Sequence, residues 1–232
     1  MIPKKIHYCW FGKGEKPKLA KKCIESWKKY CPDYEIIEWN ENNFNINSNA
    51  YVKMCYEQRK YAFLADYVRL LVVYEHGGVY FDTDVEVLKS FDDLLHCNAF
   101  FGFENNEFIN TGEGFGAEPK SEAVFQLIRE YDDFLDGKHG VIGCPILNTR
   151  AFLRLGLIKN GEQQYIEKAV IYPKDYFNPY NASTGVLTKT ENTYSIHWYG
   201  KSWIDKKTVM RSNITRIFHR FFGVDCFSCL KK

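Results

Sequence analysis

The chain has 232 residues, of which 45% are hydrophobic and 17% aromatic, and its formal net charge is +2. This length suits one large domain or two small ones, and the apolar share can fill one sizeable core. The uninterrupted apolar runs, such as Leu70–Tyr74, are far too short to cross a bilayer, and no arrangement of basic and aromatic residues resembles a nucleic-acid-binding module. We therefore expect a globular protein without a membrane span and without a nucleic-acid partner.

The cysteines indicate a reducing compartment. There are eight of them, scattered along the chain, and no N-terminal signal peptide is visible. Free thiols in a cytoplasm explain this usage better than a disulfide framework does. Cys226 and Cys229 form the only close pair, and a lone C-x-x-C is weak evidence for zinc. The expected location is cytoplasmic.

Strand and helix patterns alternate along the chain. The first elements are a buried strand at 6–11, an amphipathic helix at 17–30, a strand at 34–39 and a helix near 50–58. After the segment 61–87, the later ones are strands at 99–103 and 115–117, helices at 121–135 and 145–155, and strands at 170–173 and 193–198. Such alternation predicts a single α/β domain whose sheet contains parallel strands.

The segment from Tyr61 to Val87 carries the strongest functional signal. It predicts an apolar helix at 61–76, a Gly-Gly stop, a short strand, and then Asp82-Thr83-Asp84. The two aspartates stand at the end of this apolar strand with one residue between them, so their side chains point the same way, because strand side chains alternate between faces. Two carboxylates so close together favour a divalent cation between them, and oxygen ligands suit Mn²⁺ or Mg²⁺.

Three further residues are candidates for the site because they lie close in sequence to the Asp82–Asp84 motif. Asp66 and Arg69 are three residues apart on the apolar helix and therefore share a face. They are either a local ion pair or a site for sugar hydroxyls and phosphate. Tyr80 alternates to the same face as the aspartates, so we expect it either to contact a nucleotide or to pack in the core.

The order of these motifs resembles family 32 of the glycosyltransferase classification, whose members carry a DXD sugar-binding region. Residues 2–12, IPKKIHYCWFG, are similar to the opening signature of that family, and residues 196–203, IHWYGKSW, to its closing element. Residues 110–119, NTGEGFGAEP, resemble its N-x-x-x-G-A-x-P stretch, whereas Cys144 is inserted into its Gly-Pro dipeptide. The resemblance implies a GT-A fold, a Rossmann-like, mostly parallel central sheet flanked by helices, over residues 1–210.

The resemblance also implies roles around the acidic motif. Asp84 would ligate the metal ion, and Asp82 would bind ribose, donor sugar or a metal-bound water. Asp66 and Arg69 match positions that hold the donor sugar, and Arg69 would join the two aspartates in catalysis. His197 matches a late metal ligand.

Three more donor contacts follow from the same resemblance. Trp10 matches the aromatic residue near the base. Trp203 and Ser202 match residues that reach the departing diphosphate. The implied activity is a metal-dependent, retaining transfer of a hexose from a nucleotide-sugar, with UDP-sugars favoured, in bacterial capsular or surface polysaccharide synthesis. The implied acceptor is a glycan or a lipid-linked oligosaccharide.

Two other functions are compatible with the acidic motif. A haloacid-dehalogenase-type phosphatase also has an apolar strand followed by D-x-D, but Glu86 stands where that family has Thr or Val. A non-catalytic nucleotide-sugar or carbohydrate-binding module could hold a cation without turnover. Release of phosphate from simple esters through an Asp82-phosphate intermediate would decide for the phosphatase. Metal-dependent hydrolysis of a nucleotide-sugar to free nucleoside diphosphate would exclude the binding module.

The last residues form a basic amphipathic tail at 211–232. Phenylalanines and isoleucines alternate there with arginines. Such a segment either lies in a membrane interface, at the inner face of the cell membrane, or packs on the protein.

Overall fold

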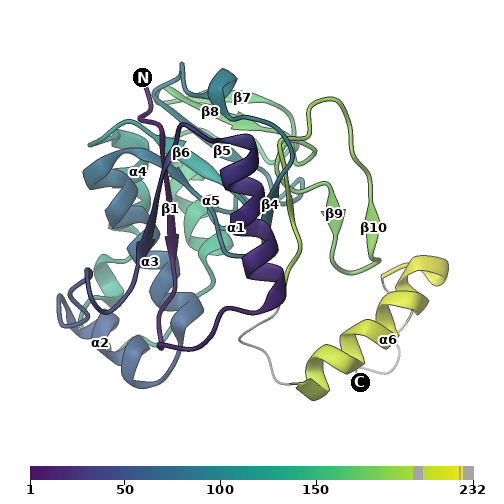
Figure 1. Ribbon diagram of the computed structural model, residues 1–232, viewed down its shortest axis with the longest axis horizontal. Coiled ribbons are helices and arrows are strands. Elements are labelled where there is room, and N and C mark those ends of the chain that lie inside the picture. Colours follow the sequence, from purple (N-terminus) through teal and green to yellow (C-terminus); the bar gives the residue numbers. More distant parts are fainter. Residues whose placement is uncertain (201–205, 225, 227–232) are drawn as a thin grey trace.

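The computed structural model describes residues 1–200, 206–224 and 226 (Figure 1). Its centre is a seven-stranded sheet with the strand order β2-β1-β3-β6-β5-β8-β7. The strands of this sheet are β1 (Lys5–Cys9), β2 (Glu35–Trp39), β3 (Gly78–Tyr80), β5 (Ala99–Gly102), β6 (Phe115–Ala117), β7 (Gln164–Ile166) and β8 (Ala169–Tyr172).

Most strands of the sheet run in one direction. β2, β1 and β3 are parallel neighbours, and so are β5 and β8. β6 lies between β3 and β5 and is antiparallel to both, so β3 and β5 run the same way. β7, at the edge, is antiparallel to β8. The sheet is therefore mostly parallel, and the predicted α/β fold is confirmed.

Helices cover both faces of the sheet. One face packs against α1 (Lys18–Tyr30), and the other against α2 (Ala50–Glu57), α3 (Tyr61–His76), α4 (Glu122–Arg129) and α5 (Cys144–Arg154). Side chains alternate accordingly along each strand. Phe100 lies in the core that contains Trp27 of α1, whereas Phe101 packs edge-on against Phe152 of α5. The two cores hold the sheet rigid beneath the loops that follow its strands.

The predicted elements agree with the observed ones within one or two residues at most ends. The helix expected at 121–135 is the exception, because α4 ends at Arg129 and the chain continues into the 3₁₀ turn η2 (Asp132–Phe134). Glu130, the first residue after α4, has a buried carboxylate that pairs with Arg150 and Arg154 of α5. Such a long-range pairing is not visible in the helical periodicity of the segment.

Small pairs of strands and one 3₁₀ turn complete the main body. β4 (Val85–Val87) pairs with β11 (Ser195–His197), and β9 (Tyr180–Asn181) pairs with β10 (Val186–Leu187). The turn is η1 (Asp92–Leu94). The β4–β11 pair brings the end of the main body back to the acidic motif, which is the most important long-range contact for the site.

The last helix, α6 (Lys206–Phe222), lies apart from the central sheet, next to β9 and β10 (Figure 1). Arg216 joins it to this region, because its Nε donates a hydrogen bond to the Ala182 carbonyl at 3.2 Å. Phe221 and Phe222 are exposed. The helix begins before the boundary expected at residue 210, so the division into domain and tail stays a prediction. None of the helices in the described ranges has the length and apolar character needed to cross a bilayer.

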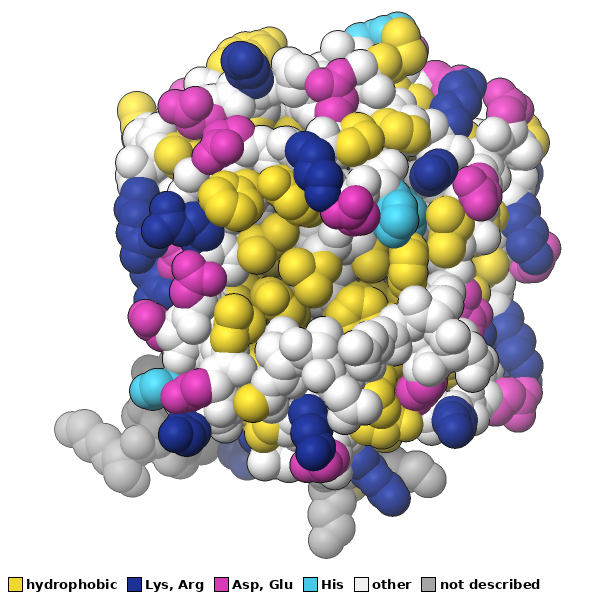
Figure 2. Space-filling model, turned by 90° about the vertical axis from the view of Figure 1, so that its left-hand side faces the viewer, with side chains coloured by type: hydrophobic (Ala, Val, Ile, Leu, Met, Phe, Trp, Pro, Cys, Tyr) yellow, Lys and Arg dark blue, Asp and Glu magenta, His cyan; other side chains and the backbone are white. Residues whose placement is uncertain are grey.

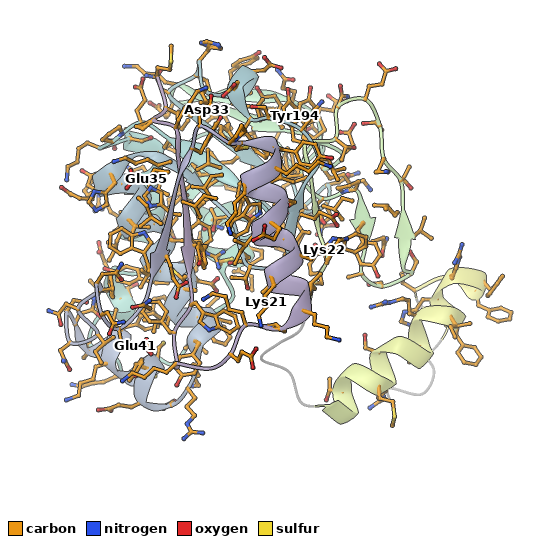
Figure 3. The ribbon with its side chains drawn as sticks, in the orientation of Figure 1. Lys21, Lys22, Asp33, Glu35, Glu41 and Tyr194 are labelled. Atoms are coloured by element: carbon orange, nitrogen blue, oxygen red, sulfur yellow. The ribbon has the colours of Figure 1, made fainter. Side chains whose placement is uncertain are left out.

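Charged and apolar side chains are distributed unevenly over the surface. Lys21 and Lys22 lie on the outer face of α1 (Figure 3), each within 2.7 Å of a carboxylate, from Glu15 and Glu86 respectively. Such exposed pairs contribute little to stability. On the side where Figure 1 shows α2, α3 and α4, apolar side chains gather at the centre of the face (Figure 2).

Candidate active site

The acidic motif lies in a turn and not on a strand. β3 ends at Tyr80, and the Val85 amide donates to the Asp82 carbonyl at 3.0 Å, which closes a tight turn before β4. The expectation that the two aspartates alternate along one strand is therefore wrong. The turn nevertheless brings Asp82 and Asp84 together at the edge of the sheet where parallel strands end, which is where α/β folds bind ligands.

Asp82 is held by a buried arginine. Arg69 of α3 is only 2% exposed, and its Nη2 lies 2.8 Å from Asp66 Oδ1 and 2.9 Å from Asp82 Oδ1. The Tyr80 hydroxyl donates to the same Asp82 oxygen at 3.1 Å. One guanidinium thus serves two carboxylates in the interior, where an unpaired charge would be costly.

Burial and charge act in opposite directions on these groups. Burial raises the pKa of Asp82 to about 6, although the Arg69 guanidinium opposes the rise. The pKa of Asp66 is also raised by burial, again against Arg69. Desolvation therefore outweighs ion pairing on this side, and both carboxyls favour a further positive partner.

Asp84 has a different environment, provided by the end of the main body. The antiparallel pairing of β4 with β11 sets His197 opposite Val85, next to Asp84. His197 Nε2 lies 3.3 Å from Asp84 Oδ1, and the Gly200 amide donates to Asp84 Oδ2 at 2.6 Å. Burial alone would raise the pKa of Asp84. His197 and the backbone amides of Gly200 and of Asp84 itself bring this pKa down to about 2. Asp84 is therefore ionised across the physiological range.

Asp82, Asp84 and His197 have the composition of a metal site. Each offers one ligand atom, and these atoms all lie within 4.8 Å of one another. The Nδ1 of His197 is buried and has no hydrogen-bond partner among the residues that the structure describes, although buried polar atoms are normally paired. Two carboxylate oxygens and one imidazole nitrogen suit Mn²⁺, and with more water also Mg²⁺. The residues present therefore fit a divalent ion.

A glycine lets the loop before β6 approach the aspartate. The Asp82 amide donates to the Gly112 carbonyl at 3.0 Å, and a Cβ on Gly112 would lie 2.3 Å from Asp82 Oδ2. Beside it, Arg69 Nη1 lies 3.5 Å from Thr111 Oγ1 and 3.7 Å from Cys144 Sγ. Sequence reasoning did not assign Gly112, Thr111 or Cys144 to the site. The resemblance of 110–119 to a family stretch was the available signal.

Of the remaining predicted site residues, the structure describes Tyr80 and Trp10 but not Ser202 and Trp203. Tyr80 is 1% exposed and supports Asp82 through its hydroxyl, so of its two expected roles the structure favours packing. Trp10 follows β1 at the edge where Asp82 lies, because β1 and β3 are parallel with His7 opposite Tyr80. Its role near the base stays a prediction. Ser202 and Trp203 lie outside the described residues.

Comparison with known proteins finds similarity to glycosyltransferases. Residues 17–101 match the family described as glycosyltransferase sugar-binding region containing DXD motif. Inositol phosphoceramide mannosyltransferase 3 of Schizosaccharomyces pombe is 33% identical over 107 residues, which are 43% of this chain and 29% of that protein. Lactosylceramide 4-alpha-galactosyltransferase of Mus musculus is 28% identical over 156 residues, 60% of this chain and 41% of that protein. The chain thus spans less than two thirds of the length of these relatives.

A solved structure shows the same fold. PaToxG glycosyltransferase superimposes with a TM-score of 0.54 at 18% identity, over 66% of this chain and 69% of that one. The match of 17–101 includes the helix α3, the turn with Asp82 and Asp84, and the strand β4. Over residues 17–101 the chain therefore resembles the glycosyltransferase sugar-binding region containing the DXD motif, and its fold is the GT-A fold.

Proposed function

We propose that this chain is a metal-dependent glycosyltransferase that moves a sugar from a nucleotide-sugar, with UDP-sugars favoured, to a glycan or lipid-linked acceptor. The observation that carries the proposal is the convergence of Asp82, Asp84 and His197 on one point, beside a buried guanidinium. Carboxylates next to a cationic group form a site that accepts a metal-bound diphosphate. The family match favours this activity over the phosphatase.

The residues of the site would have two roles, metal binding and electrostatic stabilisation of the donor. Asp84, ionised and fixed by the Gly200 amide, and His197 would hold the ion, with Asp82 completing the set. When bound there, Mn²⁺ or Mg²⁺ supplies a Lewis acid for the diphosphate leaving group. Arg69 keeps Asp82 in place and adds positive potential close to the donor, which is preorganised because its partners are already fixed.

The transfer balances as a displacement at the anomeric carbon. The acceptor hydroxyl forms the new bond to that carbon, while the bond from the carbon to the diphosphate oxygen breaks and its electron pair leaves with the nucleoside diphosphate. The acceptor proton ends on the leaving phosphate or in solvent. We propose retention of configuration and a role in capsular or surface polysaccharide synthesis from the family resemblance alone.

The acceptor and the location are part of the same proposal. Two relatives bear names that refer to inositol phosphoceramide and lactosylceramide. A lipid-linked acceptor would place the enzyme at a membrane surface, and the exposed phenylalanines of α6 offer an interfacial contact from the cytoplasmic side. Co-sedimentation with anionic vesicles tests this contact. Equal binding after deletion of residues 213–232 would remove α6 from the proposal.

A donor panel tests the activity. The protein is incubated with Mn²⁺ and with UDP-, GDP- and other nucleotide-sugars, and the free nucleoside diphosphate is measured. We expect slow hydrolysis of at least one donor, and a loss of about 10³-fold in Asp84→Ala, because the main anionic ligand is removed. Asp93→Ala is the matched control, since Asp93 is exposed and distant from the motif in sequence. Ordinary turnover by Asp84→Ala would refute the metal role.

A further inference from the structure

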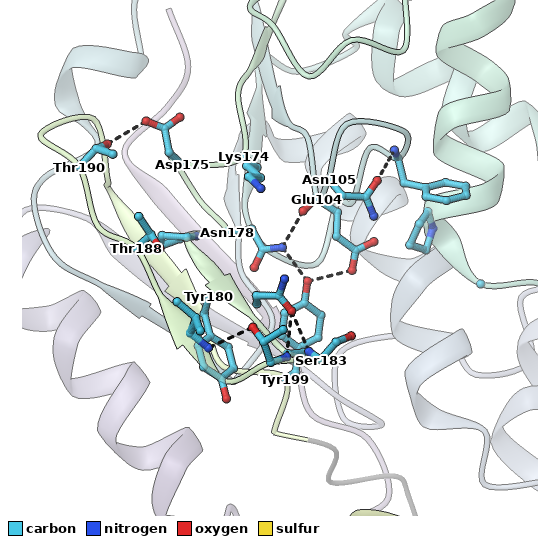
Figure 4. Close-up of a pocket in the computed structure, with 18 of the residues that line it drawn as sticks. Glu104, Asn105, Lys174, Asp175, Asn178, Tyr180, Ser183, Thr188, Thr190 and Tyr199 are labelled. Atoms are coloured by element: carbon cyan, nitrogen blue, oxygen red, sulfur yellow. Dashed lines mark hydrogen bonds between the residues drawn. The ribbon is translucent and has the colours of Figure 1, made fainter. Parts of the chain in front are cut away.

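A cleft of about 940 Å³ is lined on one side by Tyr199 (Figure 4). It is formed by the loop after β5, the start of α5 and the segment around β9 and β10. Its polar lining includes Glu104, Asn105, Lys174, Asp175 and Asn178. Its volume is at the upper end of the range for small-molecule sites, so it can take a ligand larger than one sugar ring.

Two walls of the cleft join it to the site. Tyr199 lines the cleft and stacks on His197, with ring centroids 4.2 Å apart. On the opposite side, Gly143 and Pro145 line it and flank Cys144, whose Sγ contacts Arg69. A molecule in the cleft would therefore have one end near the metal ligands and near the arginine that holds Asp82.

The tyrosine wall is fixed by a hydrogen-bond network. The Tyr199 hydroxyl donates to Glu104 Oε1 at 2.9 Å, and Asn178 Nδ2 donates to the Tyr199 hydroxyl at 2.6 Å (Figure 4). The backbone of Tyr199 has φ 51°, a left-handed conformation that costs free energy in a residue with a side chain. The fold therefore tolerates strain to place this ring between His197 and the cleft.

Asn178 carries an unpaired acceptor beneath the lining of the cleft. The residue is only 5% exposed and its Nδ2 donates two hydrogen bonds, whereas its Oδ1, itself buried, has no hydrogen-bond partner among the described residues. A buried amide oxygen without a partner costs free energy, and a ligand hydroxyl would recover part of it only if the Asn178 amide turned toward the cleft.

The lining as a whole has the chemistry of a site for a neutral sugar. Aromatic rings of Phe108, Tyr180 and Tyr199 offer flat apolar surfaces, while amide, carboxylate and hydroxyl groups offer hydrogen bonds. Among the described residues, the charged side chains of the lining are two carboxylates, Glu104 and Asp175, against one amine, Lys174. That balance disfavours a phosphorylated ligand, which would need a cationic surplus.

We propose that this cleft binds the acceptor, a neutral glycan whose reacting unit lies against Tyr199. The proposal rests on the proposed function and extends it, because it assigns a separate set of residues to the acceptor. It implies that a glycan binds the protein without donor or metal.

Ligand-observed NMR tests the cleft directly. The probes are lactose and the methyl glycosides of glucose, galactose, mannose and N-acetylglucosamine, added to the full chain without nucleotide. We expect saturation transfer to at least one probe, and at least tenfold weaker binding in Ile146→Arg, because Ile146 lines the cleft and is 53% exposed, so the larger side chain fills the cleft without entering the core. Leu153→Arg is the matched control, since Leu153 is an exposed residue of the same helix outside the cleft lining.

A second variant keeps the shape and removes the charge. Glu104→Gln should weaken the same probe several-fold, whereas Glu107→Gln, an exposed residue of the same loop, should not. If no probe binds the wild-type protein, or if Ile146→Arg and Glu104→Gln both bind like the wild type, the cleft is not the acceptor site. Asp84→Ala should bind the probes normally, so a failure of the metal role alone would leave this result unchanged.

Discussion

Two buried histidines show how differently this fold uses the same side chain. His7 lies on β1, and His197 lies on β11; neither is more than 6% exposed. Both nitrogens of His7 have partners, because Nε2 lies 2.8 Å from the Gly77 carbonyl and Nδ1 accepts from Trp39 Nε1 at 3.1 Å. The Nε2 of His197 lies next to Asp84, and its Nδ1 has no hydrogen-bond partner within the described part of the chain.

The electrostatic consequences are opposite. Burial lowers the pKa of His7 to about 4, so this ring is neutral at physiological pH. Burial also acts to lower the pKa of His197, but Asp84 and Asp82 reverse the direction and raise it. Burial alone therefore does not identify a functional histidine. What distinguishes His197 is the carboxylate of Asp84 at its Nε2, and whether this difference marks a functional histidine can be tested.

Of the changes that compare the two histidines, His197→Ala should have the largest effect. Turnover of the best donor should fall about 100-fold, or about 2.7 kcal/mol in the barrier, because one of the three proposed ligands is lost. Nucleoside diphosphate release at a fixed Mn²⁺ concentration measures it. His96→Ala is the control, since His96 is exposed. If His197→Ala turns over donor like the wild type, the two histidines differ only in packing.

A smaller effect is expected from lowering the pH, which should reduce the free energy of unfolding through protonation of His7. Its pKa is about 4 in the folded protein and about 6.5 in the unfolded chain, so between these values the unfolded chain binds more protons. The contribution is fully present above pH 6.5 and is lost as the pH falls to 4. Between pH 7.5 and 5 it should cost about 2 kcal/mol.

Urea unfolding of the wild type and of His7→Asn over this pH range isolates that contribution. The variant has no ring to protonate, so its stability should depend less steeply on pH. Parallel curves for the two proteins would show that the folded state does not disfavour the charged ring of His7.

The smallest effect is expected from Trp39→Phe. This change removes the donor to His7 Nδ1 and should lower the free energy of unfolding by about 1 kcal/mol, the usual net value of one hydrogen bond. Mn²⁺ binding should not change, since Trp39 is outside the acidic site. A loss of metal binding with unchanged stability would reverse the roles assigned to the two regions.

The fold class and the residues that surround the acidic motif could be predicted from the sequence. Helical and strand periodicity placed α3 at its observed ends, because a long apolar pattern closed by Gly77 leaves little choice. The spacing of Asp66 and Arg69 correctly indicated a shared face. The family resemblance named His197, which the structure places within the same cluster.

Other features could not be predicted from local patterns. The turn after Tyr80 depends on long-range bonds to Gly112 and on the pairing of β4 with β11, so strand alternation failed there. Contacts of Cys144 with Arg69 join residues far apart in the chain. The cleft depends on Tyr199, whose left-handed backbone no propensity favours.

The central claim is that Asp82, Asp84 and His197 hold a divalent ion for the donor diphosphate. Electron paramagnetic resonance of Mn²⁺ titrated into the protein with UDP tests it most directly. The account predicts that wild-type protein removes one equivalent of the free Mn²⁺ signal beyond that removed by UDP, and that Asp84→Ala does not. A free signal unaffected by the wild-type protein, or lowered equally by Asp84→Ala, would contradict it.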